Sequence, residues 1–243
     1  MRLLPPKSND ITGLLDRRIW GTAKRGRYLR REDTRVKKVI SRYRRGAEYL
    51  LRYLFVEYPR GLDFSIRNKA AGITLPGNHG YALTSKAALK NMIRHIPYAG
   101  KSLIDIGSGK GGVICYAYEL GLSTCTGVEY EEHLHKIAQK NIARLGYAPA
   151  VSAVRADARE YAAYADFDIY FLFNPFDYDI YADVIDRLVA QNRSASQTRG
   201  PKYLVCYGDA NIEAVHATGA FSLLVEERCP YRGNTFRIFE LKL

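Results

Sequence analysis

The feature that most limits how this chain can fold is the segment SLIDIGSGKGGVICYAYELG, residues 102–121 of 243. A short apolar run leads into a loop with four glycines in six residues, and an apolar stretch long enough for a helix follows. So bare a backbone between a strand and a helix lets a ligand come close to the helix N-terminus. The segment therefore predicts a strand–loop–helix unit of an α/β fold, with a ligand at the end of the strand.

Apolar runs and helical periodicities alternate along the rest of the chain. We expect further strands over residues 124–129, 150–157, 168–173, 203–208, 221–228 and 234–243, and helices within residues 84–96, 112–120, 131–146 and 180–191. Thr84 or Ser85 is expected to cap the first of these helices, and Gly146 to end the third. The residues of the third helix expected to face the core are Leu134, Ile137, Ala138, Ile142 and Leu145. Near-continuous apolar strands that alternate with helices predict a parallel sheet covered on both faces. The last two strands have no helix between them and should pair antiparallel at one edge. The predicted fold is α/β, a three-layer sandwich with a mostly parallel seven-stranded sheet whose last strand is antiparallel.

Positive charge is concentrated at the N-terminal end. Residues 1–60 hold 17 Lys or Arg against 6 Asp or Glu, whereas the rest of the chain holds 20 against 19. Within residues 34–58, apolar side chains that include Leu50, Leu51 and Leu54 recur at helical spacing, which is typical of a helix that packs one apolar stripe on a core; cations such as Arg52 lie between them. We therefore expect a basic helical N-terminal extension over residues 1–80 and a second domain over residues 81–243. The cations of the N-terminal extension either face water or bind phosphates or an acidic protein surface.

Composition excludes several other classes of protein. No apolar run is long enough to cross a bilayer, and the first residues, MRLLPPKSND, lack the apolar stretch of a secretion signal. We expect a cytoplasmic protein without a membrane partner. The four cysteines and five histidines show no metal-ligand spacing, so we expect buried thiols, surface imidazoles and no metal site.

Acidic residues at the strand ends indicate which ligand the glycine loop holds. Gly107, Gly109 and Gly112 satisfy a dinucleotide-binding pattern, but Asp105 stands two residues before the first glycine. A carboxylate there repels a diphosphate, so the pattern favours a cationic ligand. Glu129 ends the next strand, where an acid can accept hydrogen bonds from both ribose hydroxyls.

Two later strand ends complete the candidate site. The third strand ends in RADARE, where the carboxylate of Asp157 can accept from an adenine amino group and Ala158 can offer its backbone amide to the ring. The fourth strand ends in FLFNPFD, a sequence that is not expected in a dehydrogenase. An alternative interpretation of Asn-Pro-Phe is a simple turn at a strand end.

The motifs LIDIGSGKGG, GVE, ADA and FNPF, in this order, resemble those of the class I, seven-stranded S-adenosylmethionine-dependent methyltransferases. The resemblance runs from Tyr81 to the C-terminus and is nearest to bacterial members with Asn-Pro-Phe after the fourth strand. Non-SET protein-lysine methyltransferases carry Asn-Asn-Phe there, and amino-methyltransferases carry Asn or Asp followed by Pro-Pro-Tyr. Because Pro175 departs from the first pattern and the second proline of the other is absent, the acceptor stays open.

The resemblance implies S-adenosylmethionine as the cofactor, which has no phosphate and carries an ammonium and a sulfonium. The residues it implies as cofactor contacts are Tyr81, Thr84, Asp105, Gly107, Ser108, Gly109, Gly111, Glu129, Asp157, Ala158 and Asn174. It implies Asn174, Pro175 and Phe176 as catalytic residues. The Asn174 amide oxygen and a neighbouring backbone carbonyl would accept the N–H groups of the acceptor, while Phe176 would line the methyl channel and favour positive charge near its ring.

Other polar residues near the motifs are expected to do less. Lys110, inside the glycine loop, is predicted to face solvent. Asp177 and Asp179 could deprotonate an acceptor, or they are simply solvated loop acids. Asp105 has a second interpretation as a cap for the helix after the glycine loop.

The sequence analysis thus predicts an S-adenosylmethionine-dependent methyltransferase that methylates a nitrogen of a macromolecule. A protein side chain or a nucleic acid is favoured over a small metabolite as acceptor, since cations and aromatics are interleaved in the N-terminal extension. Two alternatives remain: a nucleotide-dependent reductase with a Rossmann domain, and a non-catalytic nucleic-acid-binding protein on a methyltransferase fold.

Overall fold

The computed structural model describes residues 47, 50–65, 81–195, 200–231 and 233–242. The chain divides into two compact units, Met1–Leu51 and Arg52–Leu243, and the description below concerns the second. Most of the predicted N-terminal extension, and its boundary at residue 80, lie outside the described residues. The extension over residues 1–80 therefore stays a prediction.

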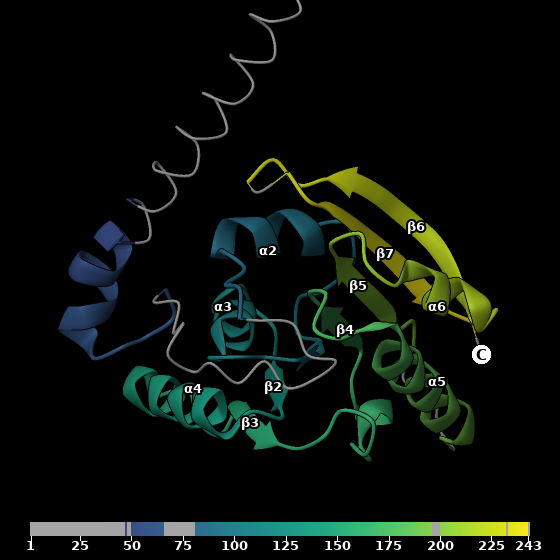
Figure 1. Ribbon diagram of the computed structural model, residues 1–243, viewed down its shortest axis with the longest axis horizontal. Helices are drawn as coiled ribbons and strands as arrows, with labels where there is room; N and C mark the ends of the chain where they lie inside the picture. Colours follow the sequence, from purple (N-terminus) through teal and green to yellow (C-terminus); the bar gives the residue numbers. More distant parts are fainter. Residues whose placement is uncertain (1–46, 48–49, 66–80, 196–199, 232, 243) are drawn as a thin grey trace, which may run out of the picture. The chain divides into compact units, whose positions relative to one another are not determined.

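One seven-stranded sheet forms the centre of the second unit, with strand order β3-β2-β1-β4-β5-β7-β6 (Figure 1). The strands are β1 Ser102–Ile106, β2 Thr124–Glu129, β3 Val151–Arg155, β4 Ile169–Leu172, β5 Tyr203–Tyr207, β6 Phe221–Arg228 and β7 Thr235–Leu241. The first five pair in parallel, and β7 lies antiparallel between β5 and β6. The predicted mostly parallel sheet with an antiparallel last strand is confirmed.

Helices cover both sides of this sheet. They are α2 Lys86–Ile93, α3 Gly112–Glu119, α4 Glu132–Leu145, α5 Tyr178–Ser194 and α6 Ile212–Ala217, with the short helices η1 Tyr53–Glu57, η2 Tyr58–Arg60 and η3 Tyr164–Asp166. Figure 1 shows α3 and α4 on one side and α5 and α6 on the other. The sequence analysis expected nothing at the six-residue α6, which is too short to show a period.

Local sequence sets the helix ends as predicted. Ser85, one of two expected caps, precedes α2, and its side chain accepts from the Ala88 amide at 3.2 Å. Gly146 ends α4 in the left-handed region at φ 68°, where glycine has no steric cost. The strands that follow these two helices, β1 after α2 and β3 after α4, both pair with β2.

The core lies against β4 and β5, whose residues are all buried. Side chains from α5, including Tyr181, Val184 and Leu188, pack on this face of the sheet. Strands buried on both faces have to be apolar throughout, which is why their positions could be predicted from continuous apolar runs. The four free cysteines are buried, as expected.

Two packing predictions are wrong in part or in full. In α4 the expected core residues Ala138 and Ile142 are buried, together with His135 and Asn141, whereas Leu134, Ile137 and Leu145, also expected in the core, are only half-buried. The face toward the sheet is rotated by one position, so His135 is not the surface imidazole that was expected. In the N-terminal apolar stripe, Leu54, which belongs to the second unit, is 46% exposed and does not pack on the core; most of that stripe lies outside the described residues.

None of the helices in the described part of the chain has the length and apolar character needed to span a membrane.

Candidate active site

The glycine loop between β1 and α3 folds back against the end of β2. The amides of Gly107 and Ser108 both donate to the Val128 carbonyl, at 2.9 and 3.0 Å. Gly107, Gly109 and Gly111 have φ of 83°, 54° and 79°, a left-handed conformation that only glycine adopts without strain. The loop backbone is therefore held at the carboxyl ends of β1 and β2.

Each of the three glycines makes a close contact that a side chain would prevent. A Cβ on Gly107 would lie 2.6 Å from Pro175, and one on Gly109 would lie 2.4 Å from the Tyr81 ring. A Cβ on Gly111 would meet Ala138 of α4 at 3.1 Å. Gly107 and Gly109 therefore join the loop to two other predicted site residues, whereas Gly111 allows helix packing.

The two predicted acids lie near each other toward the carboxyl ends of β1 and β2. Asp105 and Glu129 are almost fully buried. Glu129 Oε2 accepts from the Gly109 amide at 2.7 Å, and Oε1 accepts from the Glu131 amide at 2.8 Å. The carboxylate that is predicted to hold the ribose thus already orients the glycine loop, and an ionised carboxylate has further lone pairs for hydroxyl donors.

Burial makes both acids costly to ionise. It raises the pKa of Asp105 well above its usual value, and the nearby Glu129 charge raises it further. Burial also raises the pKa of Glu129, although hydrogen bonds from the Glu131 and Gly109 amides oppose this. A cationic ligand between these groups would lower both pKa values, so the pair is suited to bind positive charge.

Two buried hydroxyls in the same region lack a hydrogen-bond partner. Thr84 Oγ1 and Ser108 Oγ are both buried and unpaired within the described part of the structure. Buried polar atoms are normally paired, and an unpaired one often marks the position of a ligand or water. Together with the acids and the bare loop, Thr84 Oγ1 fits the polar part of S-adenosylmethionine, whereas Ser108 Oγ packs against β2, 2.5 Å from the Cβ position of Gly127.

At the end of β3, the predicted adenine contacts have partners of their own. Arg159 donates to the Asp157 carboxylate through Nη2 at 2.6 Å and through its backbone amide at 2.9 Å, and it lowers the pKa of Asp157. Ala158 is buried, and its carbonyl accepts from the Tyr164 hydroxyl at 2.7 Å. The Ala156 amide donates to the Glu129 carbonyl at 3.2 Å, which links this strand end to β2.

The Asn-Pro-Phe turn follows β4 directly opposite the glycine loop. Asn174 has φ of 40°, a left-handed conformation that is uncommon outside glycine and occurs at functional turns. Pro175 contacts Gly107, and Phe176 is buried with its ring near the same glycine. The turn is therefore in direct contact with the predicted cofactor loop.

A second loop, after β5, holds this turn from behind. A Cβ on Gly208 would lie 2.2 Å from Asn174 Nδ2, so the amide group packs flat against the Gly208 backbone. The Asn211 side chain donates to the Phe176 carbonyl at 2.8 Å. Phe173 stacks at 4.5 Å from the ring of Tyr207, the last residue of β5. Nothing in the local sequence of Gly208 indicated this role.

The prediction that Lys110 faces solvent is wrong. The side chain of Lys110 is fully buried, and its Nζ lies 2.6 Å from Asp63 Oδ1. Asp63 is 47 residues earlier in the chain, so no local pattern could reveal the pair. Asn141 of α4 forms hydrogen bonds with both residues. Its helical spacing from the buried residues Ala138 and Ile142 could have indicated that Asn141 is buried and needs a polar partner.

The chain is similar to known proteins in both sequence and fold. Residues 103–200 match the family model described as a methyltransferase domain. Similar solved structures include an RNA methyltransferase from Salinibacter ruber in complex with S-adenosyl-L-homocysteine, which is 18% identical over 66% of this chain and 94% of that chain, with a TM-score of 0.53. The putative methyltransferase yhhF from Escherichia coli is 16% identical over 67% and 90%, with a TM-score of 0.51.

The M1A22 tRNA methyltransferase TrmK from B. subtilis is 15% identical over 66% of this chain and 67% of that chain, with a TM-score of 0.53. At these identities the solved structures show a shared fold. A search of the curated proteins finds no match. The family match spans β1 to the loop before β5 and includes the glycine loop, both acids and the Asn-Pro-Phe turn. Residues 103–200 therefore match a methyltransferase domain, and the chain shares the fold of the solved methyltransferases.

Proposed function

We propose that this protein transfers the methyl group of S-adenosylmethionine to a nitrogen atom of a macromolecule. The observation that carries the proposal is the contact of the Asn174–Phe176 turn with the glycine loop, 2.6 Å from Pro175 to a Cβ position on Gly107. An acceptor group held by this turn lies beside the cofactor loop, which is the arrangement that direct methyl transfer requires. The turn's strained backbone supports a functional role over a simple strand end.

The residues of the turn suit a nitrogen acceptor. S-adenosylmethionine supplies a methyl group already activated on a sulfonium. The acceptor lone pair forms the new N–C bond as the C–S bond breaks, the bonding electrons go to sulfur, and the acceptor nitrogen loses a proton to water. Asn174 Oδ1 and the turn carbonyls can accept the N–H groups and so direct the lone pair to the methyl carbon. Such alignment can contribute about 7 to 11 kcal/mol.

The charge around the turn favours a protein side chain as acceptor. Asp177 and Asp179 follow the turn, and Asp209 follows Gly208; all three are acidic, and Asp177 and Asp179 are exposed, as is the Asp209 side chain. Carboxylates at an entrance attract an ammonium group and repel a phosphate backbone. Nucleic acid remains the second candidate, because the first 60 residues hold a large surplus of Lys and Arg.

Replacement of Asn174 tests the proposal. Asn174→Ala and wild type would be incubated with methyl-labelled S-adenosylmethionine and fractionated cell extract, and label would be counted in protein, RNA and small molecules. We expect label in the protein fraction with wild type and a loss of at least about 100-fold with the variant. Calorimetric titration with S-adenosylhomocysteine is the control: because Asn174 is only one of several implied cofactor contacts, Kd should rise by no more than about 3-fold in the variant. Loss of cofactor binding together with transfer would contradict this role for Asn174.

The two alternatives give other outcomes in a thermal-shift measurement. A ligand that binds the folded state raises the melting temperature. We expect S-adenosylhomocysteine to raise it and NADH not to. Stabilisation by NADH alone would indicate a reductase, and stabilisation by neither would indicate a non-catalytic protein.

A further inference from the structure

An ion pair joins the glycine loop to a segment far earlier in the chain. Lys110 lies between Gly109 and Gly111, and its fully buried Nζ pairs at 2.6 Å with Asp63, whose side chain is 32% exposed. The cofactor chemistry proposed above does not use this cation. A buried ammonium group is costly unless an anion compensates its charge, so Asp63 is needed to keep Lys110 in this position.

Asn141 fixes the backbone on both sides of this pair. Its Oδ1 accepts from the Asp63 amide at 2.9 Å, and its Nδ2 donates to the Asp63 carbonyl at 3.1 Å and to the Lys110 carbonyl at 3.0 Å. One side chain of α4 thus holds the glycine loop and the segment around Asp63 in a single register. Buried polar networks in which every member is paired make a structure rigid and specific.

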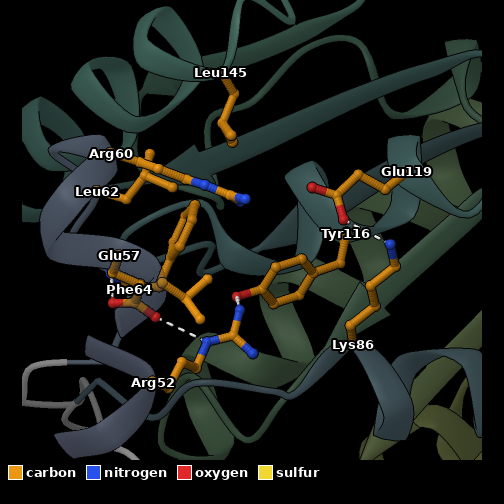
Figure 2. Close-up of a pocket in the computed structure, with 10 residues that line it drawn as sticks. Arg52, Glu57, Arg60, Leu62, Phe64, Lys86, Tyr116, Glu119 and Leu145 are labelled. Carbon is orange, nitrogen blue, oxygen red and sulfur yellow. Dashed lines mark hydrogen bonds and ion pairs between the residues drawn. The ribbon is translucent and has the colours of Figure 1, made fainter. Parts of the chain in front are cut away.

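The same segment is fixed at its other end by Glu57, which is almost fully buried. Glu57 Oε2 accepts from the amides of Phe64 and Ser65 at 2.9 and 2.8 Å. Its Oε1 accepts from Arg52 Nε at 2.9 Å, and Arg52 in turn donates to the Tyr116 hydroxyl of α3 (Figure 2). We call residues 57–65, closed by Glu57 and by Asp63, the latch.

Tyr81 connects the latch to the cofactor loop. Its hydroxyl donates to the Phe64 carbonyl at 2.7 Å, and Lys110 Nζ lies 5.6 Å from the centre of its ring. The ring covers Gly109 so closely that a Cβ there would be 2.4 Å away. Gly109 is the residue whose amide binds Glu129, the predicted ribose ligand.

We propose that the latch positions Tyr81 on the glycine loop and so sets the affinity for the cofactor. Asp63 belongs to the latch and Lys110 to the glycine loop. Both are positioning residues, because they act on the cofactor site through Tyr81. The inference rests on the proposed use of S-adenosylmethionine and deepens it, because it makes cofactor binding depend on residues outside the family-matched region 103–200.

A double-mutant cycle on cofactor affinity tests the latch. Asp63→Asn, Tyr81→Phe and the double variant would be titrated calorimetrically with S-adenosylhomocysteine, after circular dichroism confirms that each is folded. We expect each single change to raise Kd about 3- to 10-fold, the equivalent of one net hydrogen bond. Because both changes act through the position of Tyr81, the double variant should be no weaker than the weaker single variant.

Glu240→Gln is the matched control. Glu240 of β7 forms a partly exposed ion pair with Lys242, outside the latch and the glycine loop, so its replacement should leave Kd unchanged. Effects of Asp63→Asn and Tyr81→Phe that multiply, or a folded Asp63→Asn with the wild-type Kd, would overturn the latch. If Asp63→Asn does not fold, an unchanged Kd for Tyr81→Phe overturns it alone. Wild type that binds no S-adenosylhomocysteine would overturn the proposed function itself, and the latch with it.

Discussion

At Gly208 the absence of a side chain controls the position of Asn174. Gly208 has φ of 110°, and a Cβ would lie 2.2 Å from Asn174 Nδ2. We predict that Gly208→Ala displaces the amide and lowers methyl transfer by about 10- to 100-fold, because small misplacements of a group that aligns the reactants are costly. Its Kd for S-adenosylhomocysteine should stay unchanged. Label transfer and titration measure the two effects.

Gly121→Ala is the control for backbone strain. Gly121 has a similar φ of 102°, but nothing lies within 4 Å of its Cβ position. Both variants should lose about 1–2 kcal/mol of unfolding free energy through a left-handed alanine. Equal loss of transfer in the two variants would show that strain alone, and not the contact with Asn174, explains the effect.

The buried acids predict how cofactor binding depends on pH. Burial raises the pKa of Asp105 and Glu129, so the ligand-free folded state holds protons that the unfolded chain has already released. The stability that these protonated acids contribute to the folded state is therefore lost as pH rises through their pKa values in the folded state. A cationic cofactor needs the ionised acids, so its affinity should increase as pH rises above the ordinary pKa range of a carboxyl group.

Titration with S-adenosylmethionine across this range, for wild type and Asp105→Asn, measures the effect. The variant cannot ionise at residue 105, so it should bind more weakly and with a flatter pH profile. Identical profiles for the two proteins would contradict the role of Asp105.

At the residue scale, the sequence indicated the site residues that lie at the carboxyl ends of the parallel strands. Glu129 and Gly109 are 20 residues apart, and they meet because parallel strands bring their carboxyl ends to one edge. Lys110 was misjudged because its partner, Asp63, comes from a segment that no periodicity connects to the loop. Gly208 was missed for the same reason, since its contact with Asn174 depends on β4 and β5 being neighbours.

At the element scale, the two residues before α2 are predicted to have different roles, Ser85 in helix stability and Thr84 in cofactor binding. The side chain of Ser85 caps the helix, whereas the Oγ1 of its neighbour Thr84 is buried without a partner. We predict that Ser85→Ala lowers the unfolding free energy by about 1 kcal/mol with no change in cofactor Kd. Thr84→Val should keep or increase stability, because it removes an unpaired buried hydroxyl, and should weaken cofactor binding.

Denaturant unfolding and titration with S-adenosylhomocysteine measure both variants. A Thr84→Val protein with the wild-type Kd would remove Thr84 from the set of cofactor contacts. A Ser85→Ala protein with wild-type stability would show that the cap bond does not contribute in solution.

Strands were easier to predict than helix faces. β4 and β5 are buried on both sides, so each shows as an unbroken apolar run. In α4 the buried face includes His135 and Asn141, which are polar, and a count of apolar positions therefore placed the face one position away. Asn141 is buried because it bonds Asp63 and Lys110 in other segments, which a helical period does not report.

At the scale of the whole molecule, the basic N-terminal residues are predicted to act on the acceptor and not on the cofactor. Removal of residues 1–33 should leave the Kd for S-adenosylhomocysteine unchanged and lower label transfer to macromolecules, because cations that steer a large acceptor would be lost. Wild-type transfer should also fall with added salt, and more steeply for nucleic acid than for protein. Unchanged transfer after the deletion would show that these charges serve only solvation.

The most direct test of the account is a crystal structure of the protein with S-adenosylhomocysteine bound. We predict that its ribose hydroxyls donate to Glu129, that its amino group lies near Asp105 and Thr84, and that its sulfur faces the Asn174–Phe176 turn. A ligand bound elsewhere, or one that leaves Asp105 and Glu129 without contact to it, would contradict the claim that these strand ends form the methyl donor site.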